Sequence, residues 1–232
     1  MLLGIKSKKV LLFRHLLIAV IAALATYIFW FTRSEWSPDM RLWRAFGDAG
    51  FTLLFFALVI GPLAKLWNPA QRLVSWRREL GIWFAVLALT HGILIIDGWA
   101  QWSVLRFFGY EFLPQLDRFA RLEPGFGLAN LIGLFALFWT LVLGATSSDK
   151  AVNFFGVSAW KWLHYGAYII FYLTVAHVAY FLFIHYTISF HRPVPDPNWF
   201  RFPFVGMALF VFILQIAGFI KTVRDQKKSD WY

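Results

Sequence analysis

The stretch from Trp160 to Tyr186 reads WKWLHYGAYIIFYLTVAHVAYFLFIHY. After Lys161 it contains no Asp, Glu, Lys or Arg, and it exceeds the about 17–25 residues that a helix needs to cross a bilayer. Such a helix is long enough to tilt in the membrane or to protrude from it. We therefore expect a membrane-spanning helix that carries His164 and His177 within the apolar layer.

The composition of the whole chain also indicates a membrane protein. Of its 232 residues, 60% are hydrophobic and 15% are charged, and the 27 Phe, 13 Trp and 8 Tyr outnumber the charged residues. A water-soluble surface cannot be built from what remains, so a soluble enzyme is excluded. The absence of cysteine excludes disulfides, thiolate metal sites and cysteine nucleophiles, which leaves histidine and carboxylates for any metal chemistry.

Five further stretches are apolar enough to span a bilayer. The set predicts an all-α, polytopic membrane protein, a six-helix bundle that forms a single domain over residues 1–232. The expected helices lie near residues 10–31, 51–66, 81–96, 126–145, 160–186 and 202–220. We expect the basic N-terminal stretch and its apolar run to remain as the first helix instead of acting as a cleaved signal peptide. The sequence reveals no internal repeat.

Lysine and arginine are distributed unevenly between the two sides that alternate connecting segments define. With the N-terminus in the cytoplasm, fourteen Lys and Arg lie with four acidic residues on that side, whereas eight lie with eight on the other. Every lysine falls on the cytoplasmic side, as the positive-inside rule predicts. The net charge of +10 therefore indicates topology and contact with anionic lipids, not nucleic-acid binding. We expect both termini in the cytoplasm.

Two histidines lie at similar depth on different predicted helices. At 1.5 Å per residue, His91 is about 20 Å and His177 about 24 Å from the inner surface, whereas His164 lies near the inner boundary. A buried imidazole needs partners for both ring nitrogens or a metal for one of them. The matched depths favour one haem held between His91 and His177 over two separate hydrogen-bonded core histidines.

The other polar residues of the spans have simpler interpretations. We expect His15, His185 and His191 at the membrane interface or in solvent. The single amides Asn130 and Gln215 are expected to bond between helices as part of ordinary packing.

Three segments together resemble the ferric reductase-like transmembrane domain family. They are SWRRELG at 75–81 followed by His91, LGATS at 143–147, and WKWLH at 160–164 followed by His177. That family includes the STEAP metalloreductases, the membrane domains of NADPH oxidases and the bacterial methionine sulfoxide reductase haem subunit MsrQ. The resemblance covers most of the third to fifth helices. It implies a six-helix haem b protein that carries electrons across the membrane, with His91 and His177 as axial ligands of the haem iron.

This chain differs from the two-haem members of the family. These carry a second histidine on the third helix, where this chain has Arg77 and Arg78, so we expect a single haem. We interpret His164 as part of an inner flavin or quinone site, with a second-haem ligand as the alternative. Arg77, Arg78, Trp160 and Lys161 complete this expected electron-entry site, where basic groups can pair with phosphates. Positive-inside bias alone is the other interpretation of these basic residues.

The source of electrons is expected to lie outside the chain. The one glycine-spaced candidate for dinucleotide binding, at 125–127, opens a membrane helix with no strand before it. STEAP enzymes and NADPH oxidases attach soluble nucleotide-binding domains, whereas this chain ends soon after the sixth helix. We therefore expect a cytoplasmic flavin reductase, with FAD or FMN supplied from outside, or a membrane quinol as the donor.

The expected function is electron transfer through one haem b that ends in reduction of ferric chelates at the outer face. An MsrQ-like subunit that serves an exported partner enzyme is the runner-up, and a non-catalytic haem-binding or scaffold protein or a small transporter is the alternative from other classes. No catalytic residue is assigned. The bacterial inner (plasma) membrane is the expected location, and the sequence permits a homo-oligomer.

We expect outer arginines to attract anionic chelates or to pair with haem propionates, although eight acidic residues on the same side cancel the net positive charge. These arginines are Arg106, Arg118, Arg121, Arg192 and Arg201.

Overall fold

The structure, a computed structural model, describes residues 8–121, 125–185 and 197–229. Within this part of the chain, six helical segments are long and apolar enough to cross a membrane. They are Lys8–Phe31, Pro38–Leu66, Asn68–Trp99, Phe126–Ala145, Val157–His185 and Arg201–Lys228. The predicted all-α bundle with six spans is therefore confirmed, and the chain is an integral membrane protein.

The third and fifth spans are each assembled from several helical pieces. α1 (Lys8–Phe31) and α2 (Pro38–Leu66) lead to the 3₁₀-helix η1 (Asn68–Trp76), α3 (Arg77–Leu94) and the π-helix η2 (Ile95–Trp99). α4 (Val104–Phe107) and the antiparallel strands β1 (Tyr110–Leu113) and β2 (Arg118–Arg121) precede α5 (Phe126–Ala145). Then follow α6 (Asp149–Phe155), α7 (Val157–His164), α8 (Gly166–Tyr180), the π-helix η3 (Phe181–His185) and α9 (Arg201–Ser229).

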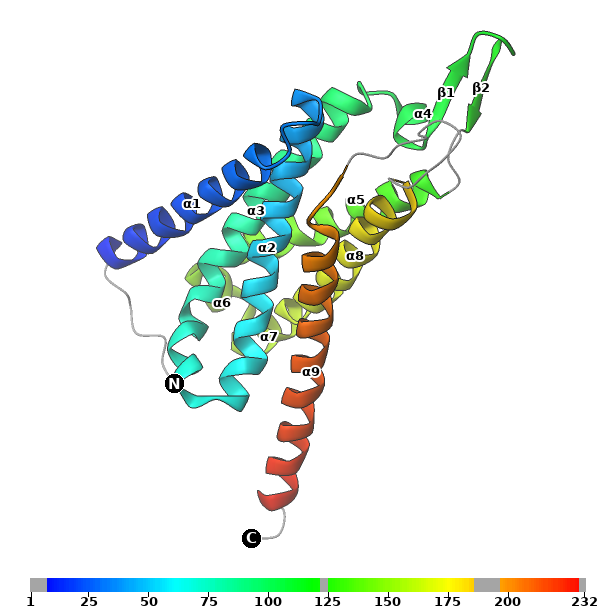
Figure 1. Ribbon diagram of the computed structural model, residues 1–232. Coiled ribbons are helices and arrows are strands. Elements are labelled where there is room, and N and C mark those ends of the chain that lie inside the picture. The colour runs from blue at the N-terminus through cyan, green and yellow to red at the C-terminus, as the bar shows by residue number, and fades with distance from the viewer. Residues whose placement is uncertain (1–7, 122–124, 186–196, 230–232) are drawn as a thin grey trace.

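The bundle has two chemically different ends (Figure 1). The hairpin end carries β1 and β2, which project beyond the helices. The lysine end lies opposite and carries the C-terminus of α2, the helix α7 and the last turns of α9, with Lys65, Lys161, Lys221 and Lys228. All four are on the side to which the sequence assigns its lysines.

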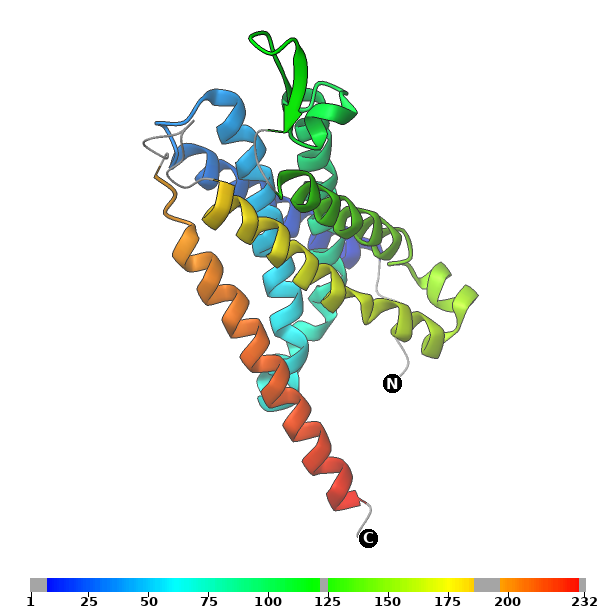
Figure 2. The same cartoon turned by 90° about the vertical axis from the view of Figure 1, so that its right-hand side faces the viewer.

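α2 lies at the centre of the bundle, where it contacts α1, α3, α8 and α9. Its apolar window is 61% buried, whereas no other span exceeds 39%. The small residues Ala45, Ala49 and Gly50 are buried along it, and small side chains let neighbouring helices approach closely in a membrane. Figure 2 shows α5 and α8 running side by side beside this central helix.

The start of α2 corrects one predicted boundary. The helix was predicted near residues 51–66, yet it begins at Pro38, where the Ser37 side chain accepts a hydrogen bond from the Met40 backbone amide at 3.4 Å. Charged residues such as Arg44 and Asp48 make the first half of α2 too polar for a hydropathy criterion. Burial of Asp48 inside the protein makes its charge tolerable within the span.

Two buried ion pairs fasten α1 to the rest of the bundle. Arg14 of α1 lies 3.3 Å from the Glu79 carboxylate of α3 and donates to the Ser75 hydroxyl at 3.2 Å. Arg33, just after α1, donates to the Asp48 carboxylate of α2 at 2.5 Å. Charges inside a bilayer are tolerated when they are paired and shielded by protein, so each pair fixes α1 against a specific neighbour.

The Arg14–Glu79 pair gives a stability prediction. Glu79→Leu leaves the Arg14 charge buried without its partner and should lower the free energy of unfolding by about 3–5 kcal/mol. The double variant Arg14→Met/Glu79→Leu should recover most of the lost free energy of unfolding, because no buried charge then lacks its partner. Denaturation by SDS in mixed micelles measures both. The control is Asp225→Asn, which breaks the exposed Lys221–Asp225 pair and should cost less than about 0.5 kcal/mol. A double variant as unstable as Glu79→Leu would contradict this account.

Candidate cofactor site

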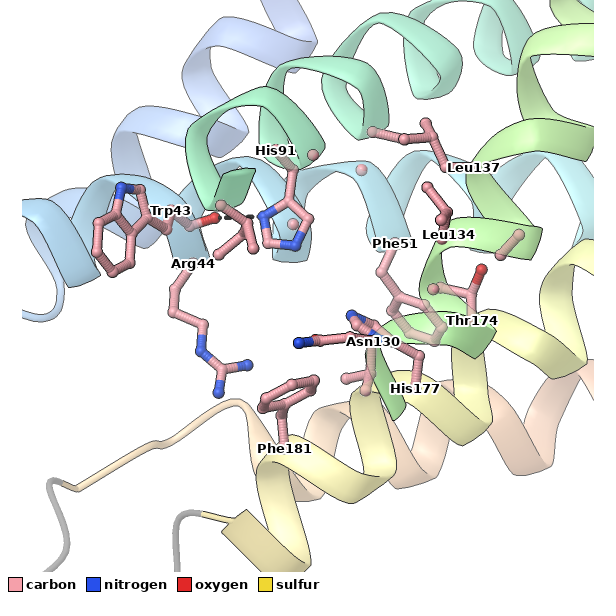
Figure 3. A pocket seen from close by; sticks show the side chains of 18 of the residues that line it. Trp43, Arg44, Phe51, His91, Asn130, Leu134, Leu137, Thr174, His177 and Phe181 are labelled. Atoms are coloured by element: carbon pink, nitrogen blue, oxygen red, sulfur yellow. Dashed lines mark hydrogen bonds between the residues drawn. The ribbon is translucent and has the colours of Figure 1, made fainter. Parts of the chain in front are cut away.

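A large cavity lies between the α2–α3 and α5–α8 helix pairs (Figure 3). It contains about 1300 Å³ of atom-free space, part of which is open to the outside. His91 and His177 both line it, together with apolar side chains such as Phe51, Leu134 and Leu137. The lining therefore comes mainly from these four helices and is largely apolar.

The backbone of α2 orients His91, which projects from α3. Its Nδ1 lies 2.8 Å from the carbonyl oxygen of Trp43. A carbonyl oxygen only accepts, so Nδ1 carries the hydrogen and donates it, which leaves a lone pair on Nε2. Figure 3 shows the His91 ring directed into the cavity.

His177, on α8, is held in the same way by α5. Its Nδ1 lies 2.7 Å from the carbonyl oxygen of Ala129, which again leaves the lone pair on Nε2. The His177 ring enters the cavity from the side opposite His91 (Figure 3). Two imidazole lone pairs, fixed by backbone carbonyls on two helices, are thereby available to one ligand.

Each histidine ring packs on a glycine of the helix that accepts its hydrogen bond. A Cβ atom at Gly47 would lie 3.2 Å from the His91 ring, and one at Gly133 would lie 2.6 Å from Nδ1 of His177. The second distance is shorter than real Cβ contacts allow, so even alanine would displace the ring. Glycine at these positions lets the helices approach closely enough for the histidine-to-carbonyl bonds.

A constant offset of 86 residues relates the two histidine environments. The first half-site is Trp43, Gly47 and His91, and the second half-site is Ala129, Gly133 and His177. The same offset separates the π-helix η2 from the π-helix η3. The chain therefore contains a structural repeat of a two-helix unit, although the sequence reveals none.

The π-helices turn later residues back toward the cavity. An α-helix advances about 100° per residue, so a residue eight positions after a histidine would point about 80° away from it. A π-turn accommodates one extra residue and returns that position to within about 20° of the histidine's face. Trp99 and His185, each eight residues after a half-site histidine, accordingly line the cavity.

Aromatic rings line the cavity where η2, η3 and α5 meet. The Phe126 ring centroid lies 4.6 Å from that of Trp99 and 5.1 Å from that of His185. His185, which was expected at the outer end of the fifth span, does end that span, and it is half-buried against these rings. Sequence reasoning misses it because a helical wheel without the π-turn rotates it away from His177. Its equal spacing with Trp99 from the two half-site histidines is the signal that points to it.

The lining residues fit a haem with two axial imidazoles. Two Nε2 lone pairs face one largely apolar cavity from separate helices. Among residues 8–121, 125–185 and 197–229, no group of three or more His, Cys, Asp or Glu is placed to hold a bare metal ion. A metal that brings its own macrocycle therefore matches this donor set better than a bare ion does.

His164 and Trp160 lie together, away from this cavity. The Trp160 ring stacks on the His164 ring at a centroid distance of 4.0 Å. Trp160 Nε1 donates to the Thr146 carbonyl at 2.9 Å, and His164 Nε2 lies 3.3 Å from the Thr146 hydroxyl. His164 is not among the residues that line the cavity of His91 and His177.

The three basic residues predicted near His164 are distributed over different contacts. Arg78 donates to the Ser147 carbonyl at 2.8 Å, next to the residue that holds Trp160 and His164. Arg77 donates to the Ala57 carbonyl of α2 at 2.9 Å and still lies close enough to His164 for its charge to act on that imidazole, and Lys161 is exposed. The structure thus brings Trp160, His164 and Arg78 to the α5–α6 connection.

The predicted outer arginines that the structure describes lie on several elements, outside the cavity of His91 and His177. Arg106 lies on α4, Arg118 and Arg121 are exposed on β2, and Arg201 begins α9. Arg192 lies outside the described residues. None of the four that the structure describes lines the cavity.

Comparison with known sequences agrees with this architecture. The profile of the family described as "Ferric reductase like transmembrane component" matches residues 46–175, more than half of the chain. The match includes Gly47, His91, Gly133 and His164 and ends two residues before His177. No curated protein sequence matches the chain. With six spans and a match over more than half of its length, the chain belongs to the ferric reductase-like transmembrane component family.

Proposed function

We propose that this protein carries electrons across the membrane from a cytoplasmic flavin reductase or quinol to an acceptor at the outer face, and that ferric chelates are this acceptor. The observation that carries the proposal is the pair of Nε2 lone pairs directed into one cavity within the spans. Membership of the ferric reductase-like family supports transmembrane electron transfer. A haem b bound in the cavity would supply a one-electron redox centre.

His91 and His177 would hold the haem iron through Nε2. Their Nδ1–H bonds to the carbonyls of Trp43 and Ala129 fix the tautomer and the ring orientation and make each imidazole a stronger ligand. The apolar lining limits access of water, which favours a defined reduction potential. The role of the chain is therefore to orient two ligands and to keep the path between the membrane faces dry.

Electrons would enter at the lysine end. The lysines there support a cytoplasmic position for this end and for both termini. The proposed location is the bacterial inner membrane. Trp160, His164 and Arg78 meet in this region, which favours an entry site for a quinone or for externally supplied FAD or FMN. Arg77 and Lys161 would add positive charge for the phosphates of a flavin.

Electrons would leave at the hairpin end. Trp99, Phe126 and His185 line the cavity there, and aromatic side chains would form the short path outward. The outer arginines would attract anionic ferric chelates. They are Arg106, Arg118, Arg121, Arg192 and Arg201.

A second candidate acceptor is an exported partner enzyme, as in an MsrQ-like subunit. The observation that favours it is the β1–β2 hairpin, which projects from the hairpin end (Figure 1). The ring centroids of Phe112 and Phe119 lie 5.4 Å apart, and the two residues are 48% and 51% exposed. An exposed aromatic pair on a projecting hairpin is typical of a contact with another protein.

Variants of the half-site histidines test the ligand assignment. His91→Ala and His177→Ala should each abolish the low-spin haem spectrum, because either change would remove one of the two imidazoles that would hold the haem. His164→Ala is the matched control, since it removes a histidine of the same fifth span outside the cavity. It should keep the wild-type spectrum while slowing reduction by an inner-side donor. Absorption and electron paramagnetic resonance spectra read the spin state. A wild-type low-spin spectrum in either half-site variant would refute the assignment.

Oriented liposomes test the direction of transfer and the acceptor. Pre-reduced protein is mixed with a ferric chelate that cannot cross the bilayer and that is added to one face only. Rapid reoxidation of the protein, monitored by absorption, is expected when the chelate faces the hairpin end and not when it faces the lysine end. Reoxidation only by a quinone or by an added protein acceptor would rule out ferric chelate reduction.

A further inference from the structure

A polar hollow lies at the lysine end, where α9 runs beside the end of α2 and the 3₁₀-helix η1 (Figures 1 and 2). It shares no lining residue with the cavity of His91 and His177. Two lysines, one aspartate, one threonine and three side-chain amides form its lining. They include Lys65, Asn68, Gln71, Lys221, Thr222 and Asp225. We refer to it as the α9 hollow.

Close packing of α9 on α2 places Lys65 at the edge of the α9 hollow. A Cβ atom at Gly218 would lie 3.3 Å from Cβ of Pro62 and 3.9 Å from Cδ of Lys65. The apolar stem of Lys65 therefore lies against α9, and its charged end extends toward the polar side. The Lys65 ammonium donates to the Thr222 hydroxyl at 3.1 Å. Because Thr222 is neutral, this bond does not balance the charge of Lys65.

The lining of the α9 hollow carries a net positive charge. Lys65 and Lys221 contribute two positive charges and Asp225 one negative charge, which leaves a net charge of +1. Asp225 lies 3.5 Å from Nζ of Lys221, but both side chains are exposed, so water and salt weaken this pair. The amides of Asn68 and Gln71 add N–H donors to the two ammonium groups. Phosphate oxygens accept hydrogen bonds from such donors, so the lining suits a phosphate group.

An apolar stripe of α9 ends beside the α9 hollow. Ile213, Ile216 and Ile220 recur at three- and four-residue spacing, and all three are exposed. Such a stripe within a membrane span suits contact with acyl chains. At 100° per residue, Lys221 lies between this stripe and Gly218, which faces α2. A lipid whose chains follow the stripe would therefore bring its headgroup to Lys221.

Trp67 indicates the depth of the α9 hollow in the membrane. It follows the last residue of α2, directly precedes Asn68, and is exposed. Tryptophan is enriched at the level of the lipid headgroups, where its ring is apolar and its N–H can meet water. Leu73 and Val74 of η1 are exposed as well, as expected for a segment that lies in the membrane interface. The α9 hollow therefore lies where the phosphates of one leaflet lie.

We infer that the α9 hollow binds the headgroup of an anionic phospholipid from the leaflet at the lysine end. Lys65 and Lys221 contact its phosphate, and its acyl chains lie along the stripe that ends at Ile220. Basic pockets between membrane helices are suited to anionic headgroups. One headgroup held by both lysines joins α2 to α9. The inference does not depend on haem binding.

Lipid titration of the purified full-length protein in detergent tests the inference. The probes are phosphatidylglycerol, which is anionic, and phosphatidylcholine with the same acyl chains, which carries no net charge. Native mass spectrometry measures how much of each lipid is bound. Wild type should bind phosphatidylglycerol more tightly. Lys65→Gln/Lys221→Gln should weaken binding of phosphatidylglycerol by about 25-fold, at about fivefold for each basic residue, and leave binding of phosphatidylcholine unchanged.

A matched control separates the α9 hollow from the general positive charge of the lysine end. Lys227→Gln/Lys228→Gln removes the same charge from the same helix, but outside the lining. It should weaken binding of phosphatidylglycerol by no more than about twofold, because water and salt screen these lysines. Asp225→Asn removes the negative charge of the lining and should strengthen binding by about fivefold. A gain in affinity cannot result from a folding defect.

Three outcomes would overturn the inference. Equal losses from the two lysine pairs would show that the general charge of the lysine end attracts the lipid. Equal binding of the two lipids by wild type would show that the α9 hollow does not recognise an anionic headgroup. Displacement of phosphatidylglycerol by an equal concentration of glycerol phosphate would show a site for soluble phosphates. The haem content of these variants should match that of wild type, so the proposed function is tested separately.

Discussion

The hydrogen bond from each half-site histidine to a backbone carbonyl of the facing helix is the interaction on which the rest of the bundle depends. It fixes the imidazole tautomer, so that the lone pair of Nε2 is available in the cavity. It also requires the two helices to lie so close that the residue beneath the ring is glycine, at Gly47 and Gly133. Helix spacing, ring orientation and ligand chemistry follow from this one contact, made twice.

The central position of α2 follows from the same requirement. α2 supplies the carbonyl and the glycine of the first half-site, contacts four other long helices and carries Asp48, whose charge Arg33 balances. The other helices expose apolar side chains around it, as Phe202 on α9 and Leu128 on α5 do, and these suit a lipid environment. The buried charges Arg14, Arg33, Asp48 and Glu79 instead pair with one another, which holds α1 to its neighbours.

The spans, and the meeting of His91 and His177 at one cavity, could be predicted from sequence, because hydropathy and helical rise depend on residue type and number alone. The structural repeat could not be predicted from sequence. Its shared parts are backbone carbonyls, which residues as different as Trp43 and Ala129 supply equally well, and glycines, which have no side chain. Hydropathy does not detect the first half of α2, because Arg44 and Asp48 lower the mean hydropathy of a segment whose polar residues face inward. His185 was missed because π-turns have no recognised signature in a single sequence.

We propose that the two half-sites together hold one cofactor. The most direct test is the haem content of the purified wild-type protein, measured by the pyridine haemochrome assay against quantitative amino-acid analysis. Two histidines directed into one cavity predict one haem b per chain. Two haems per chain would contradict this account and would make His164 a ligand, and no haem after reconstitution would show that the cavity serves another purpose.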